Sequence, residues 1–271
     1  MDEAVRVIQL KCLEILDVMD QICKSHDIQY SLCGGSVVGA HLYKGCLPWD
    51  DDIDVMMTRE NYNRFVEFAP SMLPNGFTMY NYQLGDDFTK TFTKIINDNT
   101  TLVQMDGAVT GIFLDITVYD KVPANGLRKI DFALYNLSLM VMRGKMPGNS
   151  LKNRIRSFLL DTVLSSRRRY LIFFQWVVEF LGKYAHHYNY CELFGAWANT
   201  IAYRPAVFEN YTTIEFEGKQ YMIVRDYVEY LQTRYKRTDF REPKERQVAP
   251  HYKMVDFNLP YKEYLKKSIP D

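Results

Sequence analysis

Gly34-Gly35-Ser36 and, further along, Pro48-Trp49-Asp50-Asp51-Asp52-Ile53-Asp54-Val55 are the two stretches from which the rest of the chain can be interpreted. The residues before the first stretch, Ile28 to Cys33, favour a short strand, and two glycines let the backbone turn sharply and approach a ligand closely. Ser36 is a favourable first residue for a helix, whose first-turn N–H groups point toward any bound phosphate. We therefore expect a strand, a turn that holds an anion, and a helix that ends at Pro48.

The acidic stretch predicts a divalent metal site. Residues Asp52 to Met57 favour a strand, and its alternation places Asp52 and Asp54 on one face and the apolar residues beside them in the core. Two such carboxylates, about 6 to 7 Å apart along a strand, repel one another unless a cation lies between them. Asp50 lies in line behind them. Because hard oxygen ligands favour Mg²⁺ or Mn²⁺, we expect Asp50, Asp52 and Asp54 to bind one of these ions.

A third acid interrupts the strand-like stretch Gly111-Ile112-Phe113-Leu114-Asp115-Ile116-Thr117-Val118. Buried strands seldom carry an Asp without a partner. If this strand lies beside that of Asp52 and Asp54, the three carboxylates form the metal-binding centre of a phosphoryl-transfer site, in which the metal neutralises phosphate charge and activates an acceptor hydroxyl. Lys94, in a predicted strand from Thr89 to Asn97, is either a phosphate ligand or a solvated lysine on an edge strand.

Other metal and nucleotide motifs do not fit these residues. An EF-hand loop starting at Asp50 would need Gly at its sixth position and Glu at its twelfth, where the chain has Val55 and Asn61. No Gly-Lys-Ser/Thr follows the glycines, which excludes a Walker loop, and residues 34–39 are not a dinucleotide fingerprint. A solvated acidic turn stays open as the alternative, although core-type residues such as Trp49 are embedded among the acids.

Size and composition describe an ordinary globular protein of one or two domains. The chain has 271 residues, of which 47% are hydrophobic and 24% charged. The formal net charge is zero, so no global field attracts nucleic acid, and we expect no nucleic-acid partner. The charge is unevenly spread, because residues 1–60 carry eleven acids and five Lys or Arg, whereas residues 150–190 carry two acids and seven Lys or Arg. An acidic pocket and a separate basic helical region fit this asymmetry.

The cysteines and the N-terminus predict a reduced, cytoplasmic protein. The five cysteines are odd in number and form no C-x-x-C pair. No signal peptide is evident in an N-terminus that carries Asp2 and Glu3. The most apolar window, Tyr170 to Gly182, has about thirteen residues where a membrane span needs about twenty. The basic region within residues 150–185 either contacts an anionic membrane surface, at its inner face, or is buried against neighbouring helices.

Apolar periodicity predicts the remaining elements. Helices are expected at residues 3–26, from Thr58 as N-cap to an end before Pro70, and at 127–143, 150–164, 166–200 and 227–235. Paired strands are expected at 77–83 and 89–97, and a hairpin at 211–217 and 219–224. The tail beyond Pro243 is expected to be extended and polar. Within it, Arg246 and His251 are either residues that reach back to the site or ordinary surface residues.

A nearly continuous set of segments carries a resemblance to a known family. These segments are Cys23-Lys24 through Ile28, Tyr30 to Ser36, Lys44-Gly45, Pro48 to Asp54, Arg59, Tyr62, Lys94-Ile95 to Asn99-Thr100, Asp115-Ile116 to Asp120, Pro123, Phe216-Glu217-Gly218, Tyr227, Tyr230-Leu231, Pro243, Glu245, Arg246 and His251. In them the chain resembles the LicD family, the bacterial phosphocholine transferases whose domain is shared with the fukutin-type enzymes. The chain departs from the family at Leu42-Tyr43, which stands in place of Arg-His, so a cationic contact to the donor is absent or supplied elsewhere.

The resemblance implies a fold and an activity. The expected fold class is α+β, a nucleotidyltransferase-like mixed β-sheet flanked by helices, in a single domain over residues 1–271 with a core at about 1–125 and 203–255 and a helical insertion at about 126–202. The expected reaction is metal-dependent transfer of a phospho-headgroup, most simply phosphocholine, from a CDP-linked donor such as CDP-choline. The expected acceptor is a sugar hydroxyl on a glycan or lipid-linked glycan, namely a precursor of a cell-surface polysaccharide, teichoic acid or lipopolysaccharide.

The predicted roles follow the residues above. Catalysis is expected from Asp52, Asp54 and Asp115, of which Asp115 also accepts the acceptor's proton; metal binding is expected from Asp50, Asp52, Asp54 and Asp115; donor binding is expected from Gly34, Gly35, Ser36, Lys94, Trp49, Arg246 and His251. Three alternatives stay open: a nucleotidyltransferase that uses an NTP, a ribitol-phosphate transferase, and a catalytically silent partner in glycan assembly.

Overall fold

The chain forms two compact units. The first comprises Met1–Met79, Lys94–Thr117 and Ala206–Asp271, and the second comprises Tyr80–Thr93 and Val118–Pro205. In the computed structural model, the described residues are 3–85, 92–105, 107–143, 151, 154, 158, 167–194, 199–241 and 251–268. Every site residue considered below for which a position is described belongs to the first unit.

The first unit is built on a sheet with the strand order β1-β2-β7-β4-β3. The strands are β1 (Ser31–Leu32), β2 (Asp54–Thr58), β7 (Phe113–Pro123, which continues into the second unit), β4 (Thr93–Asn97) and β3 (Phe77–Tyr80). The expected alternation is confirmed at residues 52–55, where Ile53 and Val55 are buried and Asp52 and Asp54 keep part of their surface exposed. The strand itself begins only at Asp54, and residues 55–58 are all buried. Both faces of β2 are therefore covered, and only its first residue, Asp54, keeps part of its surface exposed.

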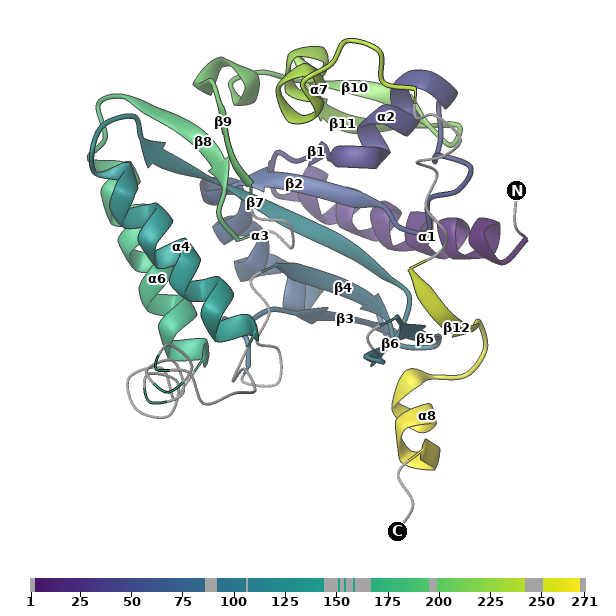
Figure 1. The fold of residues 1–271 in the computed structure, drawn as a ribbon. Coiled ribbons are helices and arrows are strands. Elements are labelled where there is room, and N and C mark those ends of the chain that lie inside the picture. The colour runs from purple at the N-terminus through teal and green to yellow at the C-terminus, as the bar shows by residue number, and fades with distance from the viewer. Residues whose placement is uncertain are drawn as a thin grey trace. The chain divides into compact units, whose positions relative to one another are not determined.

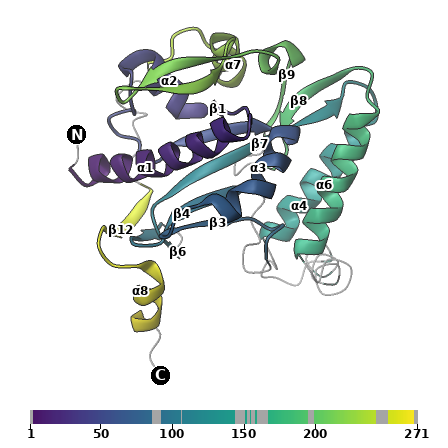
Figure 2. The same cartoon turned by 180° about the vertical axis from the view of Figure 1, so that it is seen from behind.

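Two helices cover one face of this sheet. Figure 2 shows α1 (Glu3–Ser25) and α3 (Arg59–Met72) in front of the strands. The apolar stripe predicted for the first helix is buried along its whole length. The predicted end of α3 before Pro70 is wrong: the helix continues to Met72, because a proline so close to the C-terminal end removes a single helical hydrogen bond.

A second group of elements lies at the β1 edge of the sheet (Figure 1). It contains α2 (Gly34–Tyr43), the hairpin of β10 (Tyr211–Phe216) and β11 (Lys219–Val224), and α7 (Tyr227–Tyr235). The hairpin and the last helix confirm the prediction. The start of α2 corrects it, since the helix begins at Gly34 with Cys33 as its N-cap, and not at Ser36. Its end also differs, because Lys44 in the left-handed conformation stops the helix before Pro48 is reached.

The C-terminal tail is not simply extended. Residues Tyr252–Asp256 form β12, which pairs antiparallel with β5 (Thr101–Gln104), and β5 also pairs with β6 (Val109–Thr110). A further helix, α8, covers Tyr261–Ser268. The expectation of an extended tail is therefore wrong at α8. It holds at β12, which is extended and gains its hydrogen bonds from a strand about 150 residues earlier in the chain.

In its described residues, the second unit contains two helices, two strands of its own and the second half of β7. The helices are α4 (Arg128–Arg143) and α6 (Arg167–Lys183), and the strands of its own are β8 (Tyr188–Glu192) and β9 (Asn199–Tyr203). The first helix confirms the prediction, whereas the helix expected over 166–200 is wrong beyond Lys183. Residues of β8 pair instead with the second half of β7, as in Asp120↔Cys191, and with β9. The helix expected at 150–164 falls outside the described residues apart from three isolated positions.

Helices and a mixed sheet together confirm the predicted α+β class. All five cysteines are free and buried. In the described part of the chain, no helix combines the length and the apolar character needed to cross a membrane.

Candidate active site

Three segments that are distant in sequence bring their acidic and basic side chains together. β2, which begins at Asp54, lies next to β7, which carries Asp115, and Asp115 N donates a hydrogen bond to Ile53 O at 3.4 Å. On the other side of β7 lies β4 with Lys94, whose Nζ is 2.7 Å from Asp115 Oδ1. The condition set by the sequence, that the strand of Asp115 lies beside the acidic segment, is met.

The acids of the loop before β2 disfavour one another's ionisation. Burial, followed by repulsion from Asp52 and Asp51, raises the pKa of Asp50 to about 8. Burial and repulsion from Asp115 raise the pKa of Asp52 to about 6. Burial, with repulsion from Asp52 and Asp115, also raises the pKa of Asp54 well above its ordinary value. Such a group gains stability from any positive charge placed between its members.

Lys94 is not a solvated lysine. Its side chain is only 4% exposed, and β4 lies between β7 and β3 instead of at an edge. The ammonium contacts Asp115 and also lies over the ring of Phe113, 3.0 Å from its centroid. The edge-strand alternative is therefore wrong. Contact with a donor phosphate stays a prediction, and in this structure Lys94 orients Asp115.

His251 reaches back to the acidic loop and contacts Asp51. Its backbone N donates to Asp51 Oδ2 at 2.8 Å, and its Nδ1 lies 2.8 Å from Asp51 Oδ1. This double contact ties the segment just before β12 to the acids. Arg246, the other tail residue predicted for the site, lies outside the described residues.

The two glycines lie in the first turn of α2, where each meets a different neighbour. Gly34 has a φ of +52°, which favours glycine, and its N–H donates to the hydroxyl of Tyr230 at 3.2 Å. A Cβ on Gly35 would lie 2.6 Å from Asp50 Oδ2, so only glycine lets this carboxylate approach the helix start. The hydroxyl of Ser36 accepts a hydrogen bond from Asp54 N at 2.9 Å. The start of α2 and the acids are thus in direct contact.

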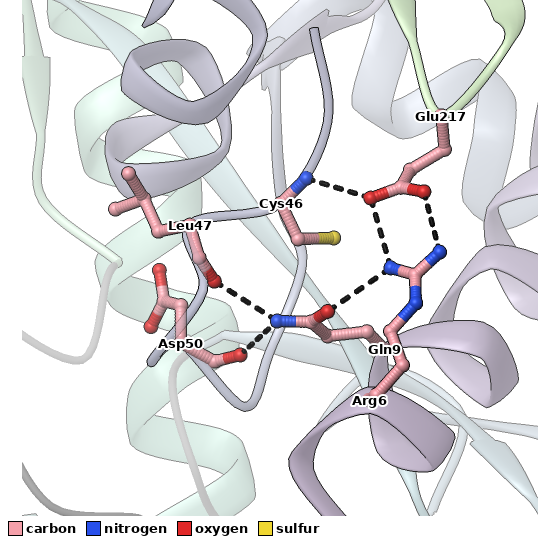
Figure 3. A network of polar contacts seen from close by, with 6 residues as sticks. All are labelled: Arg6, Gln9, Cys46, Leu47, Asp50 and Glu217. Carbon is pink, nitrogen blue, oxygen red and sulfur yellow. Dashed lines mark hydrogen bonds and ion pairs between the residues drawn. The ribbon is translucent and has the colours of Figure 1, made fainter. Parts of the chain in front are cut away.

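A buried polar network holds the loop that carries Asp50 (Figure 3). Gln9 of α1 donates from Nε2 to Leu47 O at 2.9 Å and to Asp50 O at 2.7 Å. Its Oε1 accepts from Arg6, which also makes a two-pronged ion pair with Glu217 at 3.0 and 2.7 Å. Glu217, at the tip of the β10–β11 hairpin, accepts in addition from Cys46 N at 2.9 Å. Figure 3 shows Gln9 joining the acidic loop to this ion pair.

Sequence interpretation missed several members of this site. Gln9 was detectable in principle, because it is a polar residue on the apolar stripe of a predicted helix. Tyr230 and Arg234 of α7 had no such signal. Arg234 acts against the rise in the pKa of Asp54, and its guanidinium lies near Gly34. It supplies a positive charge beside the helix start, in a chain that has Leu42-Tyr43 where the family has Arg-His.

The acids fit a divalent cation in their chemistry. They offer several carboxylate oxygens, the hard ligands that Mg²⁺ and Mn²⁺ prefer. The carboxylates are partly exposed and repel one another, so a bound cation would stabilise them. Among the described residues, no three His, Cys, Asp or Glu side chains are grouped as they would be around a bound ion. Asp50 and Asp52 instead share a hydrogen bond between their carboxyl groups, which would have to open when a cation is bound.

Comparisons with known proteins agree with this arrangement. A family model described as LicD/FKTN/FKRP, nucleotidyltransferase domain, matches residues 27–132, the segment that carries the start of α2, the acidic loop, Lys94 and Asp115. The chain is also 32% identical over 260 residues to the lipopolysaccharide cholinephosphotransferase LicD of Haemophilus influenzae, an alignment that covers 90% of this chain and 94% of that protein. The chain belongs to the LicD family.

Proposed function

We propose that this protein transfers phosphocholine from CDP-choline, or a related CDP-linked donor, to a sugar hydroxyl of a lipopolysaccharide precursor, with Mg²⁺ or Mn²⁺ as cofactor. The observation that carries the proposal is the gathering of Asp50, Asp52, Asp54 and Asp115 beside the start of α2. The name of the Haemophilus relative, a lipopolysaccharide cholinephosphotransferase, suggests the headgroup and the acceptor.

The binding roles follow from the contacts. Asp52 and Asp54, with Asp50, would hold the cation, which when bound neutralises charge on the donor's phosphates. The start of α2 would contribute the positive end of the helix dipole to the same phosphates. Three of its first N–H groups already have partners, since Gly34 N donates to the Tyr230 hydroxyl and Ser36 N and Val37 N donate to Cys33 O. The hydroxyl of Ser36 accepts from Asp54 N and keeps its own hydrogen for a phosphate oxygen.

Asp115 is the residue proposed to move the proton. The acceptor hydroxyl oxygen forms a bond to the phosphorus of phosphocholine, and the bond from that phosphorus to the CMP oxygen breaks. CMP leaves with the bonding electrons, while the proton of the acceptor hydroxyl passes to the Asp115 carboxylate. Lys94, 2.7 Å away, holds that carboxylate in one orientation.

Tyr43 and Trp49 support choline as the headgroup. Their rings meet edge to face, with centroids 6.3 Å apart and planes at 87°. Trp49 immediately precedes Asp50, and the nearest ammonium in sequence, that of Lys44, is paired with Glu215 at 2.9 Å. Two perpendicular aromatic rings suit a trimethylammonium group, which aromatic rings attract by about 0.5–2 kcal/mol.

A donor screen tests the reaction class. Purified protein with Mg²⁺ is given CDP-choline, CDP-ribitol or NTPs together with a lipopolysaccharide acceptor, and the released nucleotide is measured. Release of CMP from CDP-choline supports the proposal, and its absence in every CDP reaction overturns it. Release of pyrophosphate indicates nucleotidyl transfer. Absence of turnover together with absence of any metal-linked rise in melting temperature with CDP-choline would favour a silent partner.

Variants at the acids test the residue assignment. Asp52→Asn and Asp54→Asn remove metal-binding oxygens while keeping the side-chain volume, so CMP release should fall at least about 100-fold with the fold retained. Asp239→Asn, at an exposed acid, is the control and should stay active. Full activity of either site variant contradicts the assignment.

The headgroup assignment has its own variant. Trp49→Leu should raise KM for CDP-choline about 2- to 30-fold, the equivalent of 0.5–2 kcal/mol, and change KM for CDP-ethanolamine less, because a primary ammonium retains its hydrogen bonds to water. Equal changes for both donors would show that the ring supports the loop and not the headgroup.

A further inference from the structure

Helix α6 of the second unit exposes a continuous apolar face. Five large side chains stand out from the surface, with exposed fractions of 42% for Ile172, 52% for Phe173, 61% for Trp176, 49% for Phe180 and 64% for Tyr184. Phe173, Trp176, Phe180 and Tyr184 contact one another in series, with ring centroids 6.4, 5.6 and 5.0 Å apart. We call these five residues the aromatic face. Isolated exposed apolar residues are common, but a connected set of this kind marks an interaction site.

The orientation of α6 is fixed by its opposite side. Leu171, Phe174 and Val178 are buried, and the ring of Phe174 stacks on that of Phe194 with centroids 4.6 Å apart. Arg168 donates to the backbone carbonyls of Tyr82 and Gln83 at 3.0 and 2.9 Å. The helix therefore cannot rotate to bury the aromatic face within its own unit without losing this packing.

Basic residues mark both ends of the aromatic face. At about 100° per residue, Arg169 and Lys183 point to the same side of the helix as Trp176, one near each end, and both are exposed. The acid of this helix, Glu179, lies at the edge of that side and accepts a hydrogen bond from Gln175 at 2.6 Å. The face thus combines aromatic rings with positive charge at each end.

This charge pattern selects the occupant. In a two-fold dimer through the aromatic face, either helix orientation would bring the basic ends of the two copies together, which is repulsive. An anionic lipid surface attracts both ends at once, because exposed Lys and Arg side chains reach phosphate groups while Trp, Tyr and Phe insert at the level of the headgroups. Lys183, whose Nζ lies 5.8 Å from the centroid of the Tyr184 ring, links the charge to the rings.

We propose that the aromatic face of α6, with Arg169 and Lys183, is a peripheral docking site for an anionic phospholipid bilayer. The inference goes beyond the transfer reaction and does not depend on it. It narrows the contact predicted from the sequence for residues 150–185 to one described helix and one side of that helix.

Sedimentation of the full chain with lipid vesicles tests the docking site. Vesicles of phosphatidylcholine with about one third phosphatidylglycerol should bind the protein at least about tenfold more strongly than pure phosphatidylcholine vesicles, and high salt should reduce the difference. The combined variant Phe173→Ser, Trp176→Ser and Phe180→Ser should lose at least about tenfold in binding. Arg169→Glu with Lys183→Glu should lose about 30-fold or more on the anionic vesicles alone.

The controls keep the test decisive. Leu10→Ser with Met72→Ser removes exposed apolar side chains from the first unit and should bind vesicles as the unchanged protein does. Trp176→Phe should retain binding, and Trp176→Ser alone replaces the triple variant if that variant unfolds.

Absence of vesicle binding, equal binding to both vesicle types, or unchanged binding of the serine variant overturns the proposal. Loss of a dimer in the serine variant without vesicle binding assigns the face to a second copy and also overturns it.

Discussion

Replacing Gln9 by Leu tests how the acidic loop is held. Gln9 is fully buried, and its amide donates to the backbone carbonyls of Leu47 and Asp50. Leu has a similar volume but no donor, so both carbonyls lose this hydrogen bond. Arg6 loses one acceptor at the same time and keeps its ion pair with Glu217.

The expected loss follows from these contacts. A buried acceptor left without a donor costs about 1–3 kcal/mol. Leu47 O is buried but keeps a hydrogen bond from Asp50 N at 3.1 Å, and Asp50 O is only partly buried, so neither carbonyl bears the full cost. The free energy of unfolding should therefore fall by about 1–3 kcal/mol.

Urea unfolding followed by circular dichroism measures this loss. Gln21→Leu is the matched control, because it makes the same substitution at an exposed position of the same helix and should change stability by less than about 0.5 kcal/mol. A second measurement is the Mg²⁺ concentration for half-maximal CMP release, at a temperature where each variant is folded. It should rise in Gln9→Leu, because the Asp50 loop is no longer fixed.

Two results would refute this reasoning. A stability loss below about 0.5 kcal/mol would show that the carbonyls find other donors and that the network has little structural weight. A loss of the expected size with unchanged Mg²⁺ dependence would show that Gln9 supports the fold without positioning the acids.

Two further predictions concern other parts of the chain. Burial, followed by repulsion from Asp120, raises the pKa of Asp131 from 3.8 to about 7, and neither carboxyl oxygen has a hydrogen-bond partner. Between about pH 4 and 7 the folded state keeps a proton that the unfolded state releases, so stability falls as the pH rises through this range. Asp131→Asn should remove this loss, so its free energy of unfolding should exceed that of the unchanged protein by at most about 4 kcal/mol at pH 8 and by little at pH 4. Urea unfolding midpoints of both proteins across this pH range measure the difference. A difference that does not depend on pH would contradict the prediction. A Cβ on Gly39 would lie 2.4 Å from the backbone oxygen of Gly45. Gly39→Ala should therefore destabilise the protein by about 1–3 kcal/mol. An unchanged melting temperature would show that the loop at Gly45 moves away without loss of stability.

Local signals predicted α1, α4, α7 and the hairpin. The apolar stripe of α1 and the turn at Gly218 each depend on neighbours within a few residues, and both were interpreted correctly. The strands β8 and β12 could not be found in this way. Each is a short segment without marked alternation, and each exists because a partner strand offers it hydrogen bonds.

The candidate site divides in the same manner. The acidic stretch and Asp115 stood out because carboxylates within apolar sequence need a reason. The ion pair of Lys94 with Asp115, the contact of His251 with Asp51 and the support from Gln9 join segments far apart in the chain. Such pairings leave no spacing signal in one sequence.

From its residues alone, this chain could be assigned several of its helices, a short acidic motif beside a glycine turn and a family resemblance, since these depend on side-chain type and on periodicity over a few residues. The α+β fold class was implied by the resemblance. The order of the strands, the burial of Lys94, the network behind Asp50 and the exposed side of α6 became known only from the folded chain. They depend on which distant segments meet, and this is set by the packing of the whole core and by long-range hydrogen bonds.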